Sequence, residues 1–383
     1  MASGRKWCRE GTYYLLMVTA VFGWALINEA NLLLLVGGIL CAPLLLNWWM
    51  CKASLRGIDV RRRVVRSVMA GTPLYVELEV RNTRRRRGSW GLTIQDQLVK
   101  RSAGADVALM QPRVFLLSLP AGQQRRVRYR LVVPRRGSYR FGPLVITSRS
   151  PFGLFRWDHV LPASDSLTVY PRLGRLSPAW RRRYDPYRQG ARGTQRPGRA
   201  AGDFYAVREW QVGDSARWIH WRRSARQGQL IVRQFERPGD FHLVVLVDLW
   251  QPGRHHQDHE KFETAISFVG TLVADLCRQP GLRLRVGLTG EKPEWISGLS
   301  GPQLMTRILE RLALAEDGQR DELDALLALG QEEVPEQAQM LVVSPRADLR
   351  SRESDGLCLP RGGKTVRLIG PSDPDFGQYF KVN

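Results

Sequence analysis

Two uninterrupted apolar runs stand near the start of the chain. Residues 12–27 and 32–50 contain no charged side chain, and as helices both are long enough to cross the hydrocarbon core of a bilayer. Only the sequence NEAN separates the two runs, so the pattern predicts a transmembrane helical hairpin within residues 1–52. A cleaved signal peptide is the alternative, which the second, longer run disfavours because no small-residue cleavage site precedes it.

Hydrophobic and polar residues alternate in the next part of the chain, residues 58–174. Every second residue from Leu74 to Val80 is apolar, and the same period returns in RRVRYRLVV, residues 125–133. A period of two is typical of a strand with one buried face. Short strands separated by turn residues predict an all-β, sandwich-like domain over 58–174. Residues 175–201 are rich in Arg, Gly and Pro without periodicity, which predicts a basic linker.

The last part of the chain, residues 240–383, combines buried strands with helical spacing. FHLVVLVDLW, residues 241–250, is a nearly continuous apolar run, as expected of a parallel strand buried on both faces. Apolar residues then recur every three or four positions over 262–276, and LRLRVGLTG resumes as a strand. This order predicts a doubly wound α/β sheet with its ligand edge at the carboxyl ends of the strands. Asp248 lies at that edge.

Charge is distributed unevenly along the chain. Residues 1–240 contain 42 Lys and Arg against 15 Asp and Glu, whereas residues 241–383 contain 16 against 21. Basic residues flank both ends of the predicted hairpin, and its short loop carries only Glu29, so the positive-inside rule predicts a multi-pass inner-membrane protein whose soluble domains are cytoplasmic. The run Arg84–Arg87 is either a solvated hairpin tip or a contact with anionic lipid headgroups.

Nucleic acid is a second polyanion that the basic part could bind, because aromatic residues are interleaved with its arginines. The basic residues are, however, spread over the membrane-proximal half, and the chain contains no recognisable nucleic-acid-binding motif, so no nucleic-acid partner is expected. Five scattered cysteines without paired spacing predict a reducing compartment rather than a disulfide framework or a zinc ribbon.

Residues 202–238 concentrate tryptophan and arginine, most densely in GDSARWIHWRRSAR, residues 213–226. Asp214 is a good N-cap for a short helix that begins at Ser215, with Arg217 close enough to pair with it. The spacing then favours Trp221 packing inward and Trp218 facing outward. Two interpretations stay open, a clasp that pins the segment to its own α/β domain or a docking surface for a partner. The residues that carry either role are Arg208, Asp214, Arg217, Trp218, Trp221 and Arg226.

The chain resembles the bacterial family called domain of unknown function 58 over nearly its whole length. The matching signature residues are Phe204, Arg208, Glu209, Gly213, Asp214, Arg217, Ile219, Trp221, Ser224, Ala225, Arg226, Leu230 and Arg233, together with SPFGLFRW at 150–157. Trp210 departs from the family's usual tyrosine. The resemblance implies a von Willebrand factor A-like α/β domain and a membrane-anchored, non-enzymatic adaptor or scaffold that binds a protein partner, a MoxR-type AAA+ ATPase.

The residue patterns do not favour a metal site, a cofactor site or catalysis. An intact von Willebrand A metal site has Asp-x-Ser-x-Ser, because Mg²⁺ prefers hard oxygen ligands, but here the run is DLWQP, so only Asp248 remains of a degenerate site. The cluster of His255, His256 and His259 with Asp258 suggests a zinc metallohydrolase as a less favoured alternative to a solvated loop. Ser224 has no neighbouring base that would activate it as a nucleophile.

Overall fold

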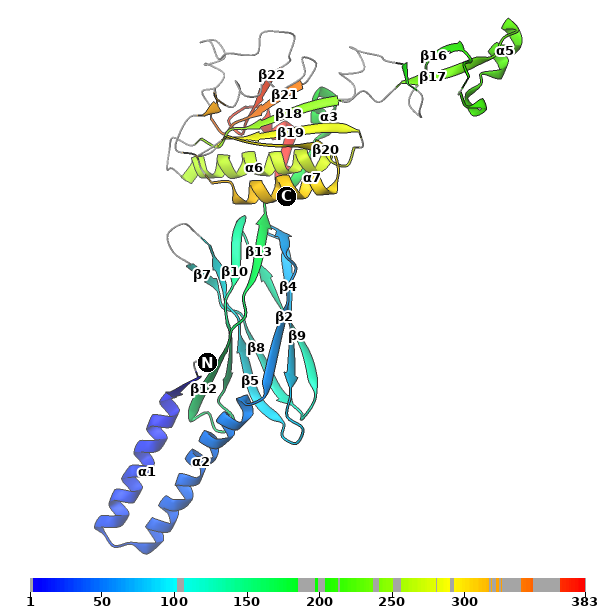
Figure 1. Ribbon diagram of the computed structural model, residues 1–383. Coiled ribbons are helices and arrows are strands. Elements are labelled where there is room, and N and C mark those ends of the chain that lie inside the picture. The colour runs from blue at the N-terminus through cyan, green and yellow to red at the C-terminus, as the bar shows by residue number, and fades with distance from the viewer. Residues whose placement is uncertain are drawn as a thin grey trace. The chain divides into compact units, whose positions relative to one another are not determined.

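The computed structural model describes residues 3–101, 107–184, 197–198, 204–212, 214–236, 241–250, 256–279, 281–289, 293–316, 318, 322–323, 325, 339–346 and 366–382. The chain divides into two compact units, Met1–Tyr170 and Pro171–Asn383 (Figure 1).

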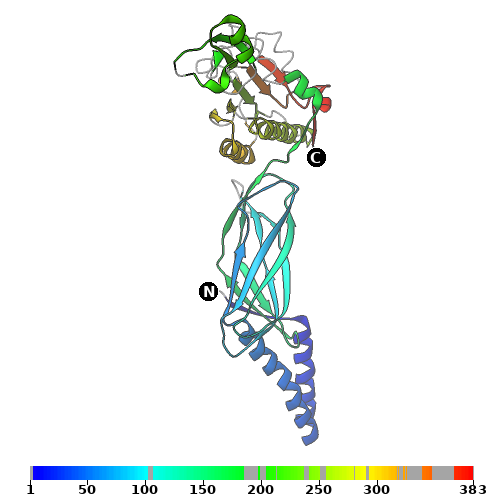
Figure 2. The ribbon, with the colours of Figure 1, turned by 90° about the vertical axis from the view of Figure 1, so that its right-hand side faces the viewer.

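The first unit begins with a helical hairpin that projects from one end of a β domain (Figures 1 and 2). Its helices are α1 (Arg9–Ile27) and α2 (Asn31–Leu55), and both are long and apolar enough to cross a membrane. A strand that the sequence pattern did not predict, β1 (Ser3–Trp7), precedes α1 and pairs with β12 (Phe155–Leu161) of the β domain. Because β2 (Ile58–Arg63) follows α2 directly, both ends of the hairpin are attached to the same domain.

The β domain confirms the strand-rich character expected of residues 58–174. Alternate residues of β4 (Pro73–Asn82), including Val76, Leu78 and Val80, are fully buried, as the period of two predicts. Its strands form the sheets β1-β12-β11-β5-β8, β3-β13-β10-β6-β7 and β2-β4-β9. The remaining strands are β3 (Ser67–Met69), β5 (Ser89–Gln95), β6 (Leu98–Lys100), β7 (Val107–Met110), β8 (Arg113–Leu119), β9 (Gln124–Val132), β10 (Gly137–Phe141), β11 (Leu144–Ser148) and β13 (Asp165–Tyr170).

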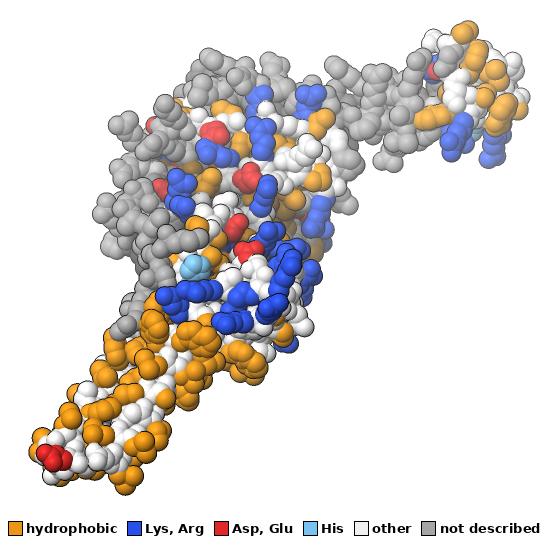
Figure 3. Space-filling model, turned by 60° about the horizontal axis from the view of Figure 1, so that its bottom comes forward, with side chains coloured by type: hydrophobic (Ala, Val, Ile, Leu, Met, Phe, Trp, Pro, Cys, Tyr) orange, Lys and Arg blue, Asp and Glu red, His pale blue; other side chains and the backbone are white. Residues whose placement is uncertain are grey.

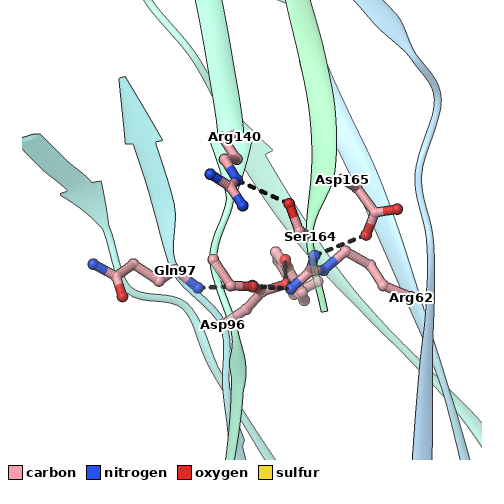
Figure 4. A network of polar contacts seen from close by, with 8 residues as sticks. Arg62, Asp96, Gln97, Arg140, Ser164 and Asp165 are labelled. Carbon is pink, nitrogen blue, oxygen red and sulfur yellow. Dashed lines mark hydrogen bonds and ion pairs between the residues drawn. The ribbon is translucent and has the colours of Figure 1, made fainter. Parts of the chain in front are cut away.

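A buried arginine links several strands of this domain (Figure 4). Arg62 donates from Nε and Nη2 to the two carboxylate oxygens of Asp96, at 2.9 and 2.7 Å, and from Nη1 to Asp165 at 2.8 Å. The hydroxyl of Tyr129 also donates to Asp96, at 2.6 Å. Buried charges must be paired and hydrogen bonded, so this network fixes how β2, β9 and the β5–β6 connection pack.

The C-terminal end of α2 is fastened to the loop that contains SPFGLF. Asn47 is buried, and its Oδ1 accepts hydrogen bonds from the backbone N–H groups of Phe152 and Leu154, at 3.0 and 3.4 Å. Cys51 lies one turn further along α2 and donates from Sγ to the carbonyl of Ser150 at 3.1 Å. A side chain at Gly11 of α1 would collide with the carbonyl oxygen of Leu154, so α1 approaches the same loop closely. The Pro-Phe-Gly element thus holds the base of the hairpin.

The second unit contains an open sheet of order β20-β19-β18-β21-β22. The strands β18 (Phe241–Val247), β19 (Leu282–Leu288), β21 (Gln339–Val343) and β22 (Val366–Ile369) are parallel, and β20 (Glu294–Leu299) is an antiparallel edge that the sequence did not predict. Helices α6 (His256–Leu276) and α7 (Pro302–Leu314) pack against each other. Val244, Leu246 and Val342 form a separate buried cluster with Leu323.

The predicted linker, 175–201, differs from the structure over its first residues. β14 (Gly174–Leu176) pairs with β23 (Phe380–Val382), and α3 (Pro178–Tyr184) follows it; α10 (Phe376–Tyr379) immediately precedes β23. Trp180 of α3 is buried edge-on against Phe268 of α6. The buried indole joins residues 174–184 to the α/β unit. A helix as short as α3 is too short for its hydrophobic periodicity to be recognised in the sequence.

Candidate protein-interaction surface

The signature segment is built on a pair of antiparallel strands. β16 (Phe204–Glu209) pairs with β17 (Ile231–Glu236), which also pairs with the short β15 (Pro197–Gly198). A 3₁₀ turn, η1 (Ala216–Trp218), and a short helix, α5 (Trp221–Gln227), connect β16 to β17. Gly228 ends α5 with φ of 69°, a left-handed conformation that glycine adopts without strain.

Arg208 and Asp214 form a bidentate ion pair inside this connection. The guanidinium Nη1 and Nη2 donate to the two carboxylate oxygens at 2.6 and 2.7 Å, and the backbone N–H of Gln211 donates to the same carboxylate at 2.9 Å. The hydrogen bonds to Asp214 raise the pKa of Arg208 above its ordinary value. The predicted role of Asp214 as N-cap is wrong, because Ser215 is the residue that precedes η1, and it makes no side-chain cap. The Asp214 carboxylate instead pairs with Arg208 of β16.

Ser224 and Ile219 fix α5 to β17. The Ser224 hydroxyl accepts a hydrogen bond from the backbone N–H of Ile231 at 2.9 Å and lies 3.2 Å from the carbonyl oxygen of His220, to which it can donate. Ile219 is buried and forms an isolated bridge with Val232. From the sequence, Ser224 was considered only as a nucleophile, and this positioning role was missed. The apolar residues Ile231 and Val232 that follow α5 could have indicated that Ser224 faces a strand.

Several other side chains of the signature segment face outward. Trp221 is 66% exposed, and four arginines within five positions of it in the sequence are also exposed: Arg217, Arg222, Arg223 and Arg226. Trp218 is half-buried. The predicted orientation of the two indoles is thus reversed. The physical reason is that Ile219 takes the buried position and α5 begins at Trp221, which places this indole on the outer side of the first helical turn. Gly213 lies outside the described residues.

Asp248, the predicted remnant of a metal site, is bound by an arginine. It follows β18 directly and is buried; Nε of Arg346 lies 2.7 Å from its Oδ2, and Nη2 donates to Oδ1 at 3.1 Å. The Ser344 hydroxyl donates to Oδ2 at 2.7 Å, and the Arg346 guanidinium stacks 3.9 Å from the ring centroid of Trp250. Burial raises the pKa of Asp248, while Arg346 and Ser344 oppose that shift.

This arrangement does not fit a divalent cation. Mg²⁺ needs several free oxygen ligands, but the guanidinium of Arg346 already occupies both oxygens of Asp248. The Thr289 hydroxyl, at the end of β19, accepts a hydrogen bond from the backbone N–H of Leu249.

Of the predicted histidine cluster, His255 lies outside the described residues, and His256 and His259 fall in the first turn of α6. Among the described residues, no group of three or more metal-ligating side chains is assembled.

Comparison with known proteins supports the family resemblance. Residues 206–348 match the family model described as "Protein of unknown function DUF58", a range that begins in β16 and ends just after Arg346. The uncharacterized protein YeaD of Bacillus subtilis (strain 168) is 24% identical over 259 residues, which are 66% of this chain and 61% of YeaD. The chain thus spans about three fifths of the length of that curated relative.

The similarity to solved structures is low. A CARDB domain from Pyrococcus furiosus is 12% identical, covering 29% of this chain and 86% of that domain, with a TM-score of 0.20. A β-glucosidase from Listeria innocua is 16% identical, covering 29% of this chain and 16% of the enzyme, also at 0.20. Scores of this size support no conclusion about fold or activity.

Proposed function

From the premise that this chain carries the DUF58 family region over residues 206–348, we propose that it is a membrane-anchored, non-enzymatic adaptor that binds a protein partner. The observation that carries the proposal is the exposed indole of Trp221 among four exposed arginines. Trp and Arg are the residues that most often dominate binding energy at protein interfaces.

Within the signature segment, some residues make internal contacts and others are exposed, which supports partner binding by the exposed cluster. Arg208, Asp214 and Ser224 make contacts inside the segment, so their presence is explained by folding. Trp221 and Arg222 are both exposed at the start of α5, and folding of the segment does not account for them. Because the exposed charged side chains within five positions of Trp221 in the sequence are all arginines, the complementary partner surface is acidic with an apolar pocket for the indole.

The family resemblance points to a MoxR-type AAA+ ATPase as the partner. The second unit is then a von Willebrand factor A-like domain, an assignment supported by its mostly parallel sheet of order β20-β19-β18-β21-β22. Asp248 and Arg346 supply a metal-independent structure at the sheet edge, so partner binding in this protein does not require Mg²⁺.

The proposed location is the inner membrane, with both units in the cytoplasm. Two features support it. The attachment of β1 and β2 to one domain requires both ends of the hairpin to lie on the same side of the membrane. The basic residues that flank the hairpin support a cytoplasmic assignment of this side.

The proposal is tested by measuring how the full-length protein in bilayer nanodiscs binds the purified MoxR-type ATPase of the same cell. Trp221→Ala is expected to weaken binding by about 30-fold, because interface anchors contribute about 2 kcal/mol or more. Thermal stability should change by less than about 1 kcal/mol, since this side chain is exposed.

Trp90→Ala is the matched control, because Trp90 is a comparably exposed indole, at 54%, in the β domain. It should leave ATPase binding unchanged. If Trp221→Ala binds the ATPase like the unchanged protein, or if no ATPase binds at all, the adaptor proposal is wrong. Loss of stability in Trp221→Ala with binding retained in the folded fraction would identify the segment as a clasp.

A further inference from the structure

Basic side chains gather on the β domain around the base of the apolar hairpin (Figure 3). Six of these side chains lie near the C-terminal end of α2 or in the two loops beside it, and each is exposed or half-buried: Lys52, Arg56, Arg85, Arg86, Arg87 and Arg149. We call this set the hairpin-base surface. Within the described part of the chain, the structure gives these six side chains no carboxylate partner. By contrast, Arg63 and Arg128 of the nearby sheet pair with Glu79 and Glu77.

The run Arg84–Arg87 separates into one structural residue and three exposed ones. Arg84 donates from Nη1 to the carbonyl of Ala53, near the end of α2, at 2.5 Å, from Nη2 to the carbonyl of Gly88 at 3.1 Å, and also to the Ser89 hydroxyl. This arginine therefore ties the loop to the end of α2. Arg85, Arg86 and Arg87 are exposed, so the same anchorage holds three cations where the apolar helix ends.

Aromatic side chains indicate the depth of this surface. The Arg87 guanidinium lies 5.4 Å from the ring centroid of Trp49, and the Lys52 ammonium lies 5.6 Å from that of Trp48. Trp48 and Trp49 belong to the last turns of α2, and both are exposed. Tryptophan is enriched at the level of lipid headgroups, so the adjacent cations lie at the level of the phosphates.

We propose that the hairpin-base surface binds the headgroups of anionic phospholipids. The inference rests on the membrane hairpin of the proposed function and adds a lipid class that the anchor selects. Phosphate oxygens accept several hydrogen bonds from a guanidinium, and unpaired cations near the bilayer surface attract anionic lipid. This surface then fixes the β domain against the membrane, rather than leaving it connected only through the two helices.

The test uses the full-length protein reconstituted in bilayers that contain spin-labelled phosphatidylglycerol or spin-labelled phosphatidylcholine. The ratio of the two labels immobilised at the protein gives its preference for anionic lipid. The triple substitution Arg85→Gln, Arg86→Gln and Arg87→Gln is expected to lower that ratio by about two- to fivefold at low salt. The corresponding triple change to Lys should retain the preference, since the contact depends mainly on charge.

The matched control removes three exposed arginines of the same unit, Arg66, Arg130 and Arg135. They lie near the C-terminal ends of β2 and β9, away from the hairpin. This Gln triple has the same net charge as the first and should keep the lipid preference. An unchanged preference in the Arg85–Arg87 Gln variant, or an equal loss in the control, would overturn the proposal. Loss of single-stranded DNA binding with unchanged lipid preference would overturn it in favour of nucleic acid. ATPase binding, measured in parallel, reports the proposed function separately, because neither triple alters α5.

Discussion

At the scale of single residues, both units place an arginine against a buried aspartate. Arg62 pairs with Asp96 in the β domain, and Arg346 pairs with Asp248 at the edge of the α/β sheet. Burial removes the hydration of both charges, so each carboxylate is stable only while its guanidinium and additional donors remain. In the α/β unit this arginine contacts both carboxylate oxygens of Asp248, the residue that the sequence suggested as the remnant of a metal site.

Removal of Arg346 should therefore be strongly destabilising. Arg346→Ala leaves the buried carboxylate of Asp248 without its cation, and we expect a loss of about 3 to 5 kcal/mol in the free energy of unfolding. Thermal unfolding of the full-length protein in detergent provides the measurement. Addition of Mg²⁺ should not change the melting temperature of the unchanged protein. Arg311→Ala removes an exposed pair with Glu294 and should cost less than about 1 kcal/mol. Similar losses in both variants would contradict the expectation that the buried ion pair contributes more stability than the exposed one.

Tyr129 should make stability depend on pH in the alkaline range. Burial, and then the Asp96 carboxylate, raise the pKa of Tyr129 far above its ordinary value. Above a pH of about 10 the unfolded chain releases this proton while the folded chain retains it, so the free energy of unfolding falls as pH rises.

Tyr129→Phe should lower stability near neutral pH by about 1 to 3 kcal/mol, because Asp96 loses a hydrogen bond. The same variant should show a shallower decline above pH 10 when unfolding is followed across the pH range. Tyr75, which is exposed on the adjacent strand β4, is the control, and Tyr75→Phe should leave both the neutral stability and the alkaline slope intact. An alkaline slope that persists in Tyr129→Phe would show that other groups cause it.

At the scale of elements, the end of α2 is the junction between the apolar hairpin and the β domain. Asn47 and Cys51 bind the loop of residues 150–155, and Arg84 binds the carbonyl of Ala53. These contacts satisfy backbone groups that would otherwise be buried without partners. The direction in which the helix leaves the domain is thus set by side chains of both elements.

Asn47→Ala should loosen this junction. It leaves the backbone N–H groups of Phe152 and Leu154 without their acceptor, and we expect a cost of about 2 to 4 kcal/mol. The readouts are thermal stability and the rate of proteolysis in the 150–155 loop. Asn28→Ala is the control, since the side chain of Asn28 donates to the exposed carbonyl of Trp24 at the hairpin tip. Proteolysis that is no faster in Asn47→Ala would show that the loop does not depend on this contact.

At the scale of the whole molecule, the chain begins and ends its apolar hairpin on one β domain. β1 precedes α1 and joins the sheet through β12, while β2 follows α2 and joins the sheet of β4. The folded domain therefore includes chain from both sides of the hairpin, β1 before α1 and β2 after α2.

This connection makes the topology testable. A reporter fused to the C-terminus should indicate the cytoplasm, and one inserted between Glu29 and Ala30 should indicate the opposite side of the membrane. Reversing the charge of Arg9 and Lys52 together should reduce the fraction of chains with this orientation, because the positive-inside rule acts through such residues. A C-terminal reporter on the far side would contradict both the orientation and a cytoplasmic partner.

Local patterns in the sequence were sufficient for the two hairpin helices, for strands such as β4 and for the family resemblance, but not for β1, β20 or α3. The apolar runs predicted α1 and α2, and the alternation from Leu74 to Val80 predicted β4, because helix and strand periodicity depend on near neighbours in the chain. Tertiary structure alone decided which charged groups meet and which indole faces outward. Arg346 reaches Asp248 across 98 positions, and Ile219 takes the buried place through its bridge with Val232. Such pairings depend on strand order and register, which periodicity does not encode, and for that reason the sequence identified the signature residues but misassigned Trp221 and Asp214.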